Sequence, residues 1–306
     1  MFFDILITNA HIIDGTGAPW FRGDIGIKDG RIEAVGVIRG AVAGEVLDAG
    51  GMIVTPGFID THTHSDISFF IDTEAQSKIR QGVTTEITGN CGMSAAPLNN
   101  AAGYMTRIMD PDFKPTWVGV PEYLQLLDRQ PKTVNLAPLI GHSNLRAAVV
   151  GMDDRAATQK EIEQMKAILC EGLEAGAIGL SMGLYFSPGN FAEEEELVSV
   201  ISAASQYGAP TACHIRDEGV KTIGFVPAVE EFLGLGRQAE APIHIAHLKA
   251  FGPDVWGISG KILEMMDDAR AGGVDVTCDQ YPYTASGGLI PQDVFPTDFV
   301  KGKGPD

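Results

Sequence analysis

The feature that most constrains the fold is a repeat of short apolar segments, each ending in polar residues and followed by a helical stretch. Seven such segments lie between residues 52 and 283, and their polar ends fall near residues 64, 91, 142, 183, 214, 247 and 281. Apolar strands that alternate with helices are typical of parallel β/α units. Seven units at a recurring spacing favour a closed (β/α)8 TIM barrel over an open doubly wound sheet.

The first 55 residues have a different pattern. Segments 3–14 and 23–36 alternate apolar and polar positions, with the turn signals Asp14-Gly15 and Asp29-Gly30 between strands. We therefore expect a small β-rich unit over 1–55 and the barrel over 56–306. Residues 101–133 exceed a simple connection, and they are interpreted either as an insertion over the barrel mouth or as a long surface loop with one helix.

Composition excludes several classes of protein. The chain carries 40 acidic and 22 basic residues, a formal charge of −18, which argues against nucleic acid and anionic membranes as partners. No apolar run approaches the ~18 residues of a membrane span. Four cysteines do not make a disulfide scaffold, and the N-terminus lacks the basic start of a signal peptide. We expect a cytoplasmic protein, and the oligomeric state stays open.

The predicted strand ends carry an unusual set of side chains. His62 and His64 are two residues apart, so on a strand they face the same side. Cys91 follows the second strand, and His214 and His247 end the fifth and sixth. The carboxyl ends of barrel strands meet at one mouth, and imidazole with thiolate suits zinc. For His62 and His64 alone, two hydrogen-bonded histidines on a polar face would explain the pair equally well.

Other chemistry-bearing residues are interpreted as structural. His142 is expected behind the metal ligands rather than among them, and His244 is expected as a buried structural histidine. Cys170, Cys213 and Cys278 are expected in packing positions. The acidic run from Glu193 to Glu196 opens a helix, where a solvated first turn complements the helix dipole.

The motifs together resemble a known family. GFIDTHTHSD, ITGNCGMSAAP, GLSMGLYFSPG, HIRDEG, IAHLKAFG and DQYPYTAS occur in this order between residues 57 and 286. This combination is similar to the N-acyl-D-amino-acid deacylases (D-aminoacylases) of the amidohydrolase superfamily. His-x-His alone indicates only the superfamily, whereas Cys91 in NCG is far more specific.

The resemblance implies a metal-dependent hydrolase TIM (β/α)8 barrel with a small β-sandwich built from both termini. It also implies that Cys91, His214 and His247 hold a tightly bound zinc. His62 and His64, with Cys91 as a bridge, would form a second, weaker site. The implied reaction is hydrolysis of the amide bond of a small-molecule N-acyl-D-amino acid, with release of a carboxylate and a D-amino acid.

Further residues follow from the same resemblance. Lys249 and Tyr281 match substrate-contacting positions. The family often has a tyrosine at the position of Phe186, where its hydroxyl aids an oxyanion. Tyr185 is the neighbouring candidate here, although strand alternation would turn it to the other side.

The resemblance also has a gap. No eighth strand follows the seventh, so the family's catalytic Asp, its carboxylate-binding Arg and the rest of the sandwich are expected beyond residue 306. Two alternatives therefore stay open: a cyclic-amide hydrolase of the hydantoinase or dihydroorotase kind, and a catalytically incomplete metal-binding fragment. Relatives of the hydantoinase kind usually use a carboxylated lysine where Cys91 stands, which counts against the first. A barrel that lacks one strand leaves unpaired edges, so we expect residues 1–306 alone to be unstable or prone to aggregation.

Overall fold

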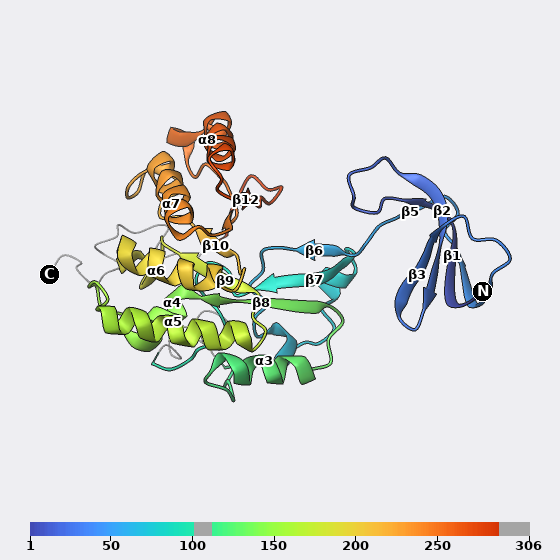
Figure 1. The fold of residues 1–306 in the computed structure, drawn as a ribbon, viewed down its shortest axis with the longest axis horizontal. Helices are drawn as coiled ribbons and strands as arrows, with labels where there is room; N and C mark the ends of the chain where they lie inside the picture. Colours follow the sequence, from blue (N-terminus) through green and yellow to red (C-terminus); the bar gives the residue numbers. More distant parts are fainter. Residues whose placement is uncertain (101–111, 288–306) are drawn as a thin grey trace. The chain divides into compact units, whose positions relative to one another are not determined.

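The computed structural model describes residues 1–100 and 112–287, and the chain divides into two compact units, Met1–Phe58 and Ile59–Asp306. Each unit has its own sheet (Figure 1). Each also has its own buried core. None of the described helices is both long and apolar enough to cross a membrane.

The first unit is a five-stranded sheet. Its strands are β1 (Phe2–Ile12), β2 (Phe21–Lys28), β3 (Arg31–Gly36), β4 (Val42–Asp48) and β5 (Ile53–Val54). The order is β3-β2-β1-β4, with β5 also beside β1. The two antiparallel pairs predicted from the sequence are present, and Asp29 and Gly30 both adopt the positive φ that a tight two-residue hairpin turn requires. Strands β4 and β5 run parallel to β1, which the pattern did not predict.

The second unit contains the seven strands predicted from the apolar segments. They are β6 (Phe58–Asp60), β7 (Val83–Thr88), β8 (Asn135–Gly141), β9 (Gly179–Gly183), β10 (Thr211–His214), β11 (Ile243–Ile245) and β12 (Val276–Cys278). They lie side by side in chain order, and the recorded pairings from β7 and β8 to β11 and β12 are parallel. Consecutive parallel strands place all their carboxyl ends at one edge, which is where the site forms.

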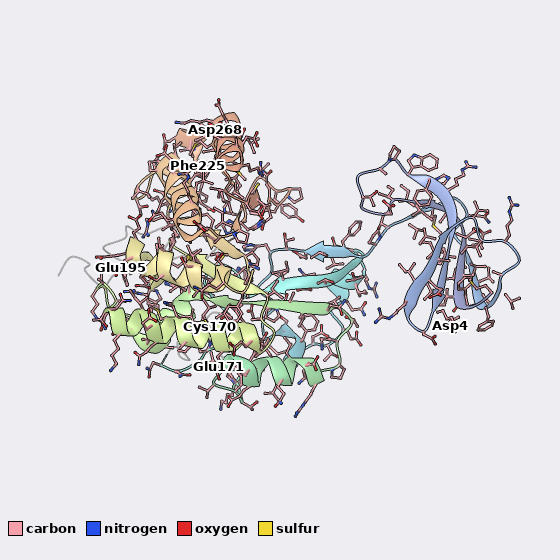
Figure 2. The ribbon with its side chains drawn as sticks, in the orientation of Figure 1. Asp4, Cys170, Glu171, Glu195, Phe225 and Asp268 are labelled. Carbon is pink, nitrogen blue, oxygen red and sulfur yellow. The ribbon has the colours of Figure 1, made fainter. Side chains whose placement is uncertain are left out.

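Helices connect these strands and pack on one another. The helical segments are η1 (Ser68–Phe70), α1 (Gln76–Ile79), α3 (Val120–Arg129), α4 (His142–Val149), α5 (Gln159–Glu174), η2 (Gly189–Phe191), α6 (Glu194–Ser205), α7 (Phe225–Ala239), η3 (Pro253–Val255) and α8 (Ser259–Ala271). Helix α5 contacts α3, α4 and α6, and α7 joins α6 to α8 (Figure 1). Helix α5 begins with a capping box between Thr158 and Glu161, which satisfies two free backbone N–H groups. Cys170 on this helix packs, half-buried, against the main core (Figure 2).

A buried polar cluster joins α4 to α6. Glu196 is 2% exposed and accepts hydrogen bonds from His142 Nε2, at 2.8 Å, and from the fully buried Arg146. The prediction of a solvated first turn is therefore wrong for Glu196, because the third residue of α6 faces α4. It holds for Glu193, Glu194 and Glu195, which are exposed.

The described part of the long connection before β8 packs into the core. Trp117 and Tyr123, 4% and 2% exposed, lie against each other with ring centroids 5.3 Å apart, and Phe70 covers both. Helix α3 lies in the described part of this segment. The prediction of an insertion over the mouth concerns residues 101–133, of which 101–111 lie outside the described residues.

Candidate metal centre

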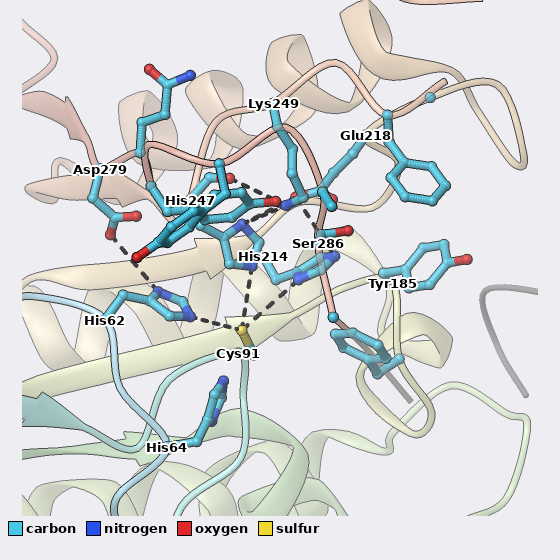
Figure 3. Close-up of a pocket in the computed structure, with 18 of the residues that line it drawn as sticks. His62, His64, Cys91, Tyr185, His214, Glu218, His247, Lys249, Asp279 and Ser286 are labelled. Atoms are coloured by element: carbon cyan, nitrogen blue, oxygen red, sulfur yellow. Dashed lines mark hydrogen bonds and ion pairs between the residues drawn. The ribbon is translucent and has the colours of Figure 1, made fainter. Parts of the chain in front are cut away.

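All the predicted site residues meet at the carboxyl edge of the parallel sheet. They line a cavity of about 780 Å³ (Figure 3). The set is His62 and His64 after β6, Cys91 after β7, Tyr185 after β9, His214 at the end of β10, His247 and Lys249 after β11, and Tyr281 after β12. Segments up to 219 residues apart in sequence thus contribute to one pocket.

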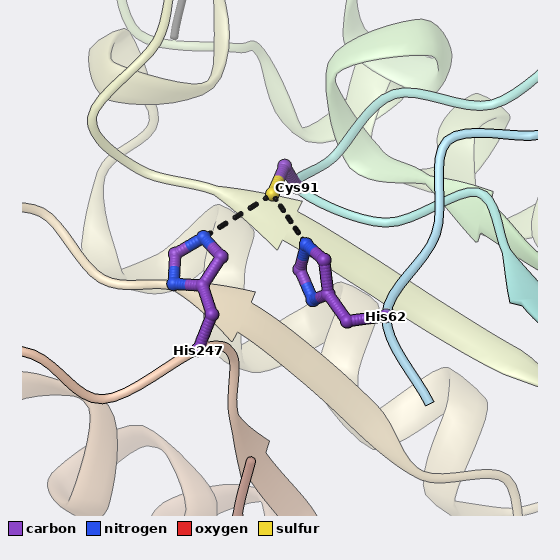
Figure 4. Close-up of side chains that lie close together, drawn as sticks. All are labelled: His62, Cys91 and His247. Carbon is purple, nitrogen blue, oxygen red and sulfur yellow. Dashed lines mark hydrogen bonds between the residues drawn. The ribbon is translucent and has the colours of Figure 1, made fainter. Parts of the chain in front are cut away.

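Cys91 is the centre of this cluster. Its Sγ lies 3.4 Å from His62 Nε2 and 3.5 Å from His247 Nε2 (Figure 4). It also lies 3.9 Å from His214 Nδ1 (Figure 3). Zinc bonds of about 2.3 Å to sulfur and about 2.05 Å to nitrogen, at the tetrahedral angle, separate the two donors by about 3.6 Å. The three distances therefore fit donors that share one metal ion.

His64 lies apart from the closest group. Its ring centroid is 5.5 Å from that of His62, and it lines the same cavity. Among the described residues, the compact sets of ligand atoms are His62 with Cys91 and His247, and His214 with Glu218 and His247. The division of the histidines between a tight and a weak site stays a prediction.

Three glycines hold the Cys91 loop against the neighbouring strands. A Cβ on Gly89 would lie 2.1 Å from the carbonyl oxygen of Leu139, and one on Gly183 would lie 2.1 Å from that of Cys91. A Cβ on Gly92 would lie 2.6 Å from the Gly183 nitrogen. The backbone segments can approach this closely only because glycine has no side chain, and these close contacts fix the position of Cys91 in the pocket.

Two of the predicted ligands have strained backbones. Cys91 has φ of 56° and His247 has φ of 72°, in the left-handed region that non-glycine residues rarely adopt. Such conformations cost of order 1–3 kcal/mol each, and they gather at functional sites. Their presence at two of the clustered donors supports a functional role for this loop pair.

The electrostatic setting favours neutral imidazoles. Burial, followed by the neighbouring His247, lowers the pKa of His62 to about 3 and that of His64 to about 4. Burial also lowers the pKa of His214 to about 3. Neutral imidazole is the form that binds a metal. Burial, followed by the negative charge of Glu218, raises the pKa of the Cys91 thiol, and the Lys249 ammonium, which acts to lower it, does not offset them.

Two carboxylates next to these histidines were not assigned to the site from the sequence. Glu218 Oε1 lies 3.1 Å from His247 Nδ1, and Asp279 Oδ2 lies 2.7 Å from His244 Nε2 and 3.8 Å from His62 Nδ1. His244 is also bonded to Thr277, and it is partly exposed rather than buried as predicted. The signal for Glu218 was its place in HIRDEG, four residues after His214.

The remaining assignments differ in outcome. His142 bonds to Glu196 and does not line the cavity, and its place behind the ligands stays a prediction. The expectation that Tyr185 turns away is wrong, because a turn follows Gly183 and ends the strand alternation. The Tyr185 and Phe186 rings both flank His214, with centroid distances of 5.7 Å and 4.6 Å.

Comparison with known proteins identifies the family. Residues 45–284, which make up most of the chain, match the amidohydrolase family. The chain belongs to the amidohydrolase family. Curated relatives of this amidohydrolase include an N-acyl-D-glutamate deacylase and a D-aminoacylase, both from Alcaligenes xylosoxydans xylosoxydans, each 39% identical over 97% and 95% of the chain. The resemblance to D-aminoacylases is thereby confirmed, although the chain spans only 61% and 60% of the length of these two relatives.

Solved structures agree with this placement. An N-acyl-D-glutamate deacylase from Bordetella bronchiseptica, crystallised with zinc and a phosphonate inhibitor, superposes with a TM-score of 0.85 at 40% identity, over 92% of this chain and 59% of that one. A D-aminoacylase gives 0.87 at 38% identity, over 93% and 59%. An L-hydantoinase from Arthrobacter aurescens, 18% identical over 92% and 58%, gives 0.61 and supports the fold alone. The second unit therefore has the curled parallel sheet of the amidohydrolase superfamily.

Proposed function

We propose that this chain carries the metal centre and part of the substrate pocket of a hydrolase that cleaves the amide bond of N-acyl-D-amino acids. The observation that carries the proposal is the Cys91 thiol, with three imidazole nitrogens at 3.4–3.9 Å, at the carboxyl edge of a parallel sheet. The sequence of the chain is 38–40% identical to deacylases and only 18% identical to a hydantoinase, and this difference favours an acyclic amide as substrate.

The metal proposed is zinc, because the donor set combines thiolate sulfur with imidazole nitrogen. Cys91, His214 and His247 are proposed as the tight site, and His62 and His64 as a weaker site that shares Cys91. The position of His62, as close to Cys91 Sγ as His247 is, supports a sulfur that faces both sites. When bound, the ion supplies Lewis-acid polarisation of the amide carbonyl and acidifies a water molecule.

The substrate end of the pocket is proposed to lie on the side of Tyr185, Lys249 and Tyr281. The Lys249 ammonium lies 5.7 Å from the centroid of the Tyr281 ring, so a cation and a hydroxyl-bearing ring stand together at the cavity wall. Such a pair suits a substrate carboxylate. Tyr185 lines the same cavity, where its ring stacks on that of His214. The general base, an Asp, is expected outside the described residues.

We propose the matching architecture as well. The β unit over 1–55 would be one part of a β-sandwich, and 56–306 would form seven units of a (β/α)8 barrel. The exposed apolar side chains of the small unit, among them Trp20, Val35, Val46 and Ile53, support a missing partner layer. The consecutive order of the seven strands supports the barrel.

The test is hydrolysis by the zinc-loaded protein. N-acetyl-D-glutamate, N-acetyl-D-methionine, their L enantiomers and a hydantoin are offered to the 306-residue chain and to the chain extended by its downstream reading frame. Release of free amino acid from D substrates alone, by the extended form at least, is expected. Ring opening of the hydantoin without D-deacylation would contradict the substrate assignment. Zinc binding by both forms without any hydrolysis would favour a metal-binding role.

A further inference from the structure

The loop after β10 places a carboxylate behind two of the predicted ligands. Glu218, whose side chain is 10% exposed, lies with Oε1 3.1 Å from His247 Nδ1 and 3.8 Å from His214 Nε2. The Lys249 ammonium donates to the same oxygen (Figure 3). One carboxylate oxygen thus faces two imidazoles, on the side of each ring away from Cys91.

Each of the two rings turns one nitrogen toward Cys91 and the other toward Glu218, but the roles of Nδ1 and Nε2 are exchanged between His247 and His214. His247 turns Nε2 to Cys91 Sγ, at 3.5 Å, and Nδ1 to Glu218. His214 turns Nδ1 to the sulfur, at 3.9 Å, and Nε2 toward Glu218. A neutral imidazole that offers a lone pair on one nitrogen carries its proton on the other. In both rings that other nitrogen faces Glu218, which can only accept.

Glu218 has a competitor for His247. The Lys249 ammonium is also 3.1 Å from His247 Nδ1, but it can only donate a hydrogen bond. A bond from Lys249 would place the imidazole proton on Nε2, with N–H directed at Cys91 and no lone pair for a metal. A bond from Nδ1–H to Glu218 gives the opposite tautomer. The carboxylate is therefore the partner that makes His247 a ligand.

The surrounding loop fixes the backbone of Glu218. The carboxylate of Asp217 accepts the backbone N–H groups of Gly219, Thr222 and Gly224, at 2.5–3.0 Å. The carbonyl oxygen of Glu218 accepts the N–H of Phe251 at 2.7 Å. Two sets of hydrogen bonds therefore fix the backbone of Glu218. The turn around Asp217 fixes it on one side, and the bond to Phe251, in the segment after His247, fixes it on the other.

We propose that Glu218 is a positioning residue of the metal centre: it holds the Nδ1 proton of His247, orients the ring, and thereby raises metal affinity. Carboxylates that accept from metal-binding histidines fix the tautomer and ring orientation, and their removal commonly costs 10–100-fold in affinity. The inference rests on the metal-binding half of the proposed function and not on the reaction.

The test compares Glu218→Gln and Glu218→Ala in the 306-residue chain. The zinc dissociation constant is measured by competition with a chromophoric chelator, and the absorption spectrum of the cobalt-loaded protein is recorded. Glu218→Ala is expected to weaken zinc about 10–100-fold at unchanged stoichiometry. Glu218→Gln, whose amide oxygen still accepts from Nδ1–H, is expected to recover most of the affinity. Both variants should keep the thiolate-to-cobalt band, because Cys91 is untouched.

Glu231→Gln is the matched control. Glu231 is a half-buried carboxylate on α7 that pairs with Arg216 at 2.9 Å and does not line the cavity, so its substitution should leave zinc affinity unchanged. Wild-type affinity in Glu218→Ala would overturn the role of Glu218 alone. Loss of all metal from Glu218→Gln would also overturn it, because it would make Glu218 a direct ligand. Failure of the unaltered chain to bind zinc would instead overturn the metal centre, and the proposed function with it.

Discussion

A methyl group on Gly183 should disrupt the metal centre although no proposed ligand is replaced. Gly183 ends β9, and a Cβ there would lie 2.1 Å from the carbonyl oxygen of Cys91. Relief to 3.4 Å, where ordinary van der Waals contact begins, requires the two segments to separate by about 1.3 Å. Metal–ligand distances hold to about 0.2 Å, so a Cys91 displaced by even part of this shift leaves the metal's reach.

The assay is zinc affinity in Gly183→Ala, with Gly234→Ala as the matched control. We expect a loss of at least tenfold in Gly183→Ala, equivalent to about 1.4 kcal/mol. No heavy atom lies within 4 Å of a Cβ at Gly234 inside α7, so that substitution should keep zinc affinity and stabilise the helix by about 0.5–1 kcal/mol. Circular dichroism of the metal-free proteins verifies folding. A folded Gly183→Ala protein with the affinity of the unaltered chain would refute the geometric argument.

Three further predictions concern ligation, stability and pH. Cys91→Ala should abolish stoichiometric zinc binding, measured by elemental analysis, and zinc retained in this variant would contradict the proposed set of ligands. Glu196→Ala should lower unfolding free energy in urea by about 3–5 kcal/mol, because it leaves Arg146 buried and unpaired; the exposed Glu195→Ala should change it by less than about 0.5 kcal/mol. Burial acts to raise the pKa of Glu196, but His142 and Arg146 outweigh it and lower the pKa below 4.5. Its stabilisation is therefore present above pH 4.5 and lost as pH falls, and Glu196→Gln should flatten that part of the stability curve.

The parallel strands and the metal cluster were predictable because each depends on a short local pattern. An apolar segment with a polar end predicts a strand and indicates which end of it faces the site. Such ends carry four of the proposed ligands, His62, Cys91, His214 and His247. The convergence of these four residues then follows from parallel strand order alone.

The misassigned residues depend on contacts that no local pattern contains. Glu196 looks like any acidic residue in a helix's first turn, and only the packing of α6 on α4 brings Arg146 to it. Tyr185 was expected to obey strand alternation, but the strand ends at Gly183. Glu218 lies in a loop whose path is set by the Asp217 turn and by Phe251, 33 residues later in the chain.

The zinc K-edge X-ray absorption spectrum of the 306-residue chain tests the thiolate–imidazole metal centre most directly. We expect one sulfur at about 2.3 Å together with imidazole nitrogens at about 2.0–2.1 Å, and loss of the sulfur contribution in Cys91→Ala. A zinc bound only by nitrogen and oxygen in the unaltered chain would contradict it.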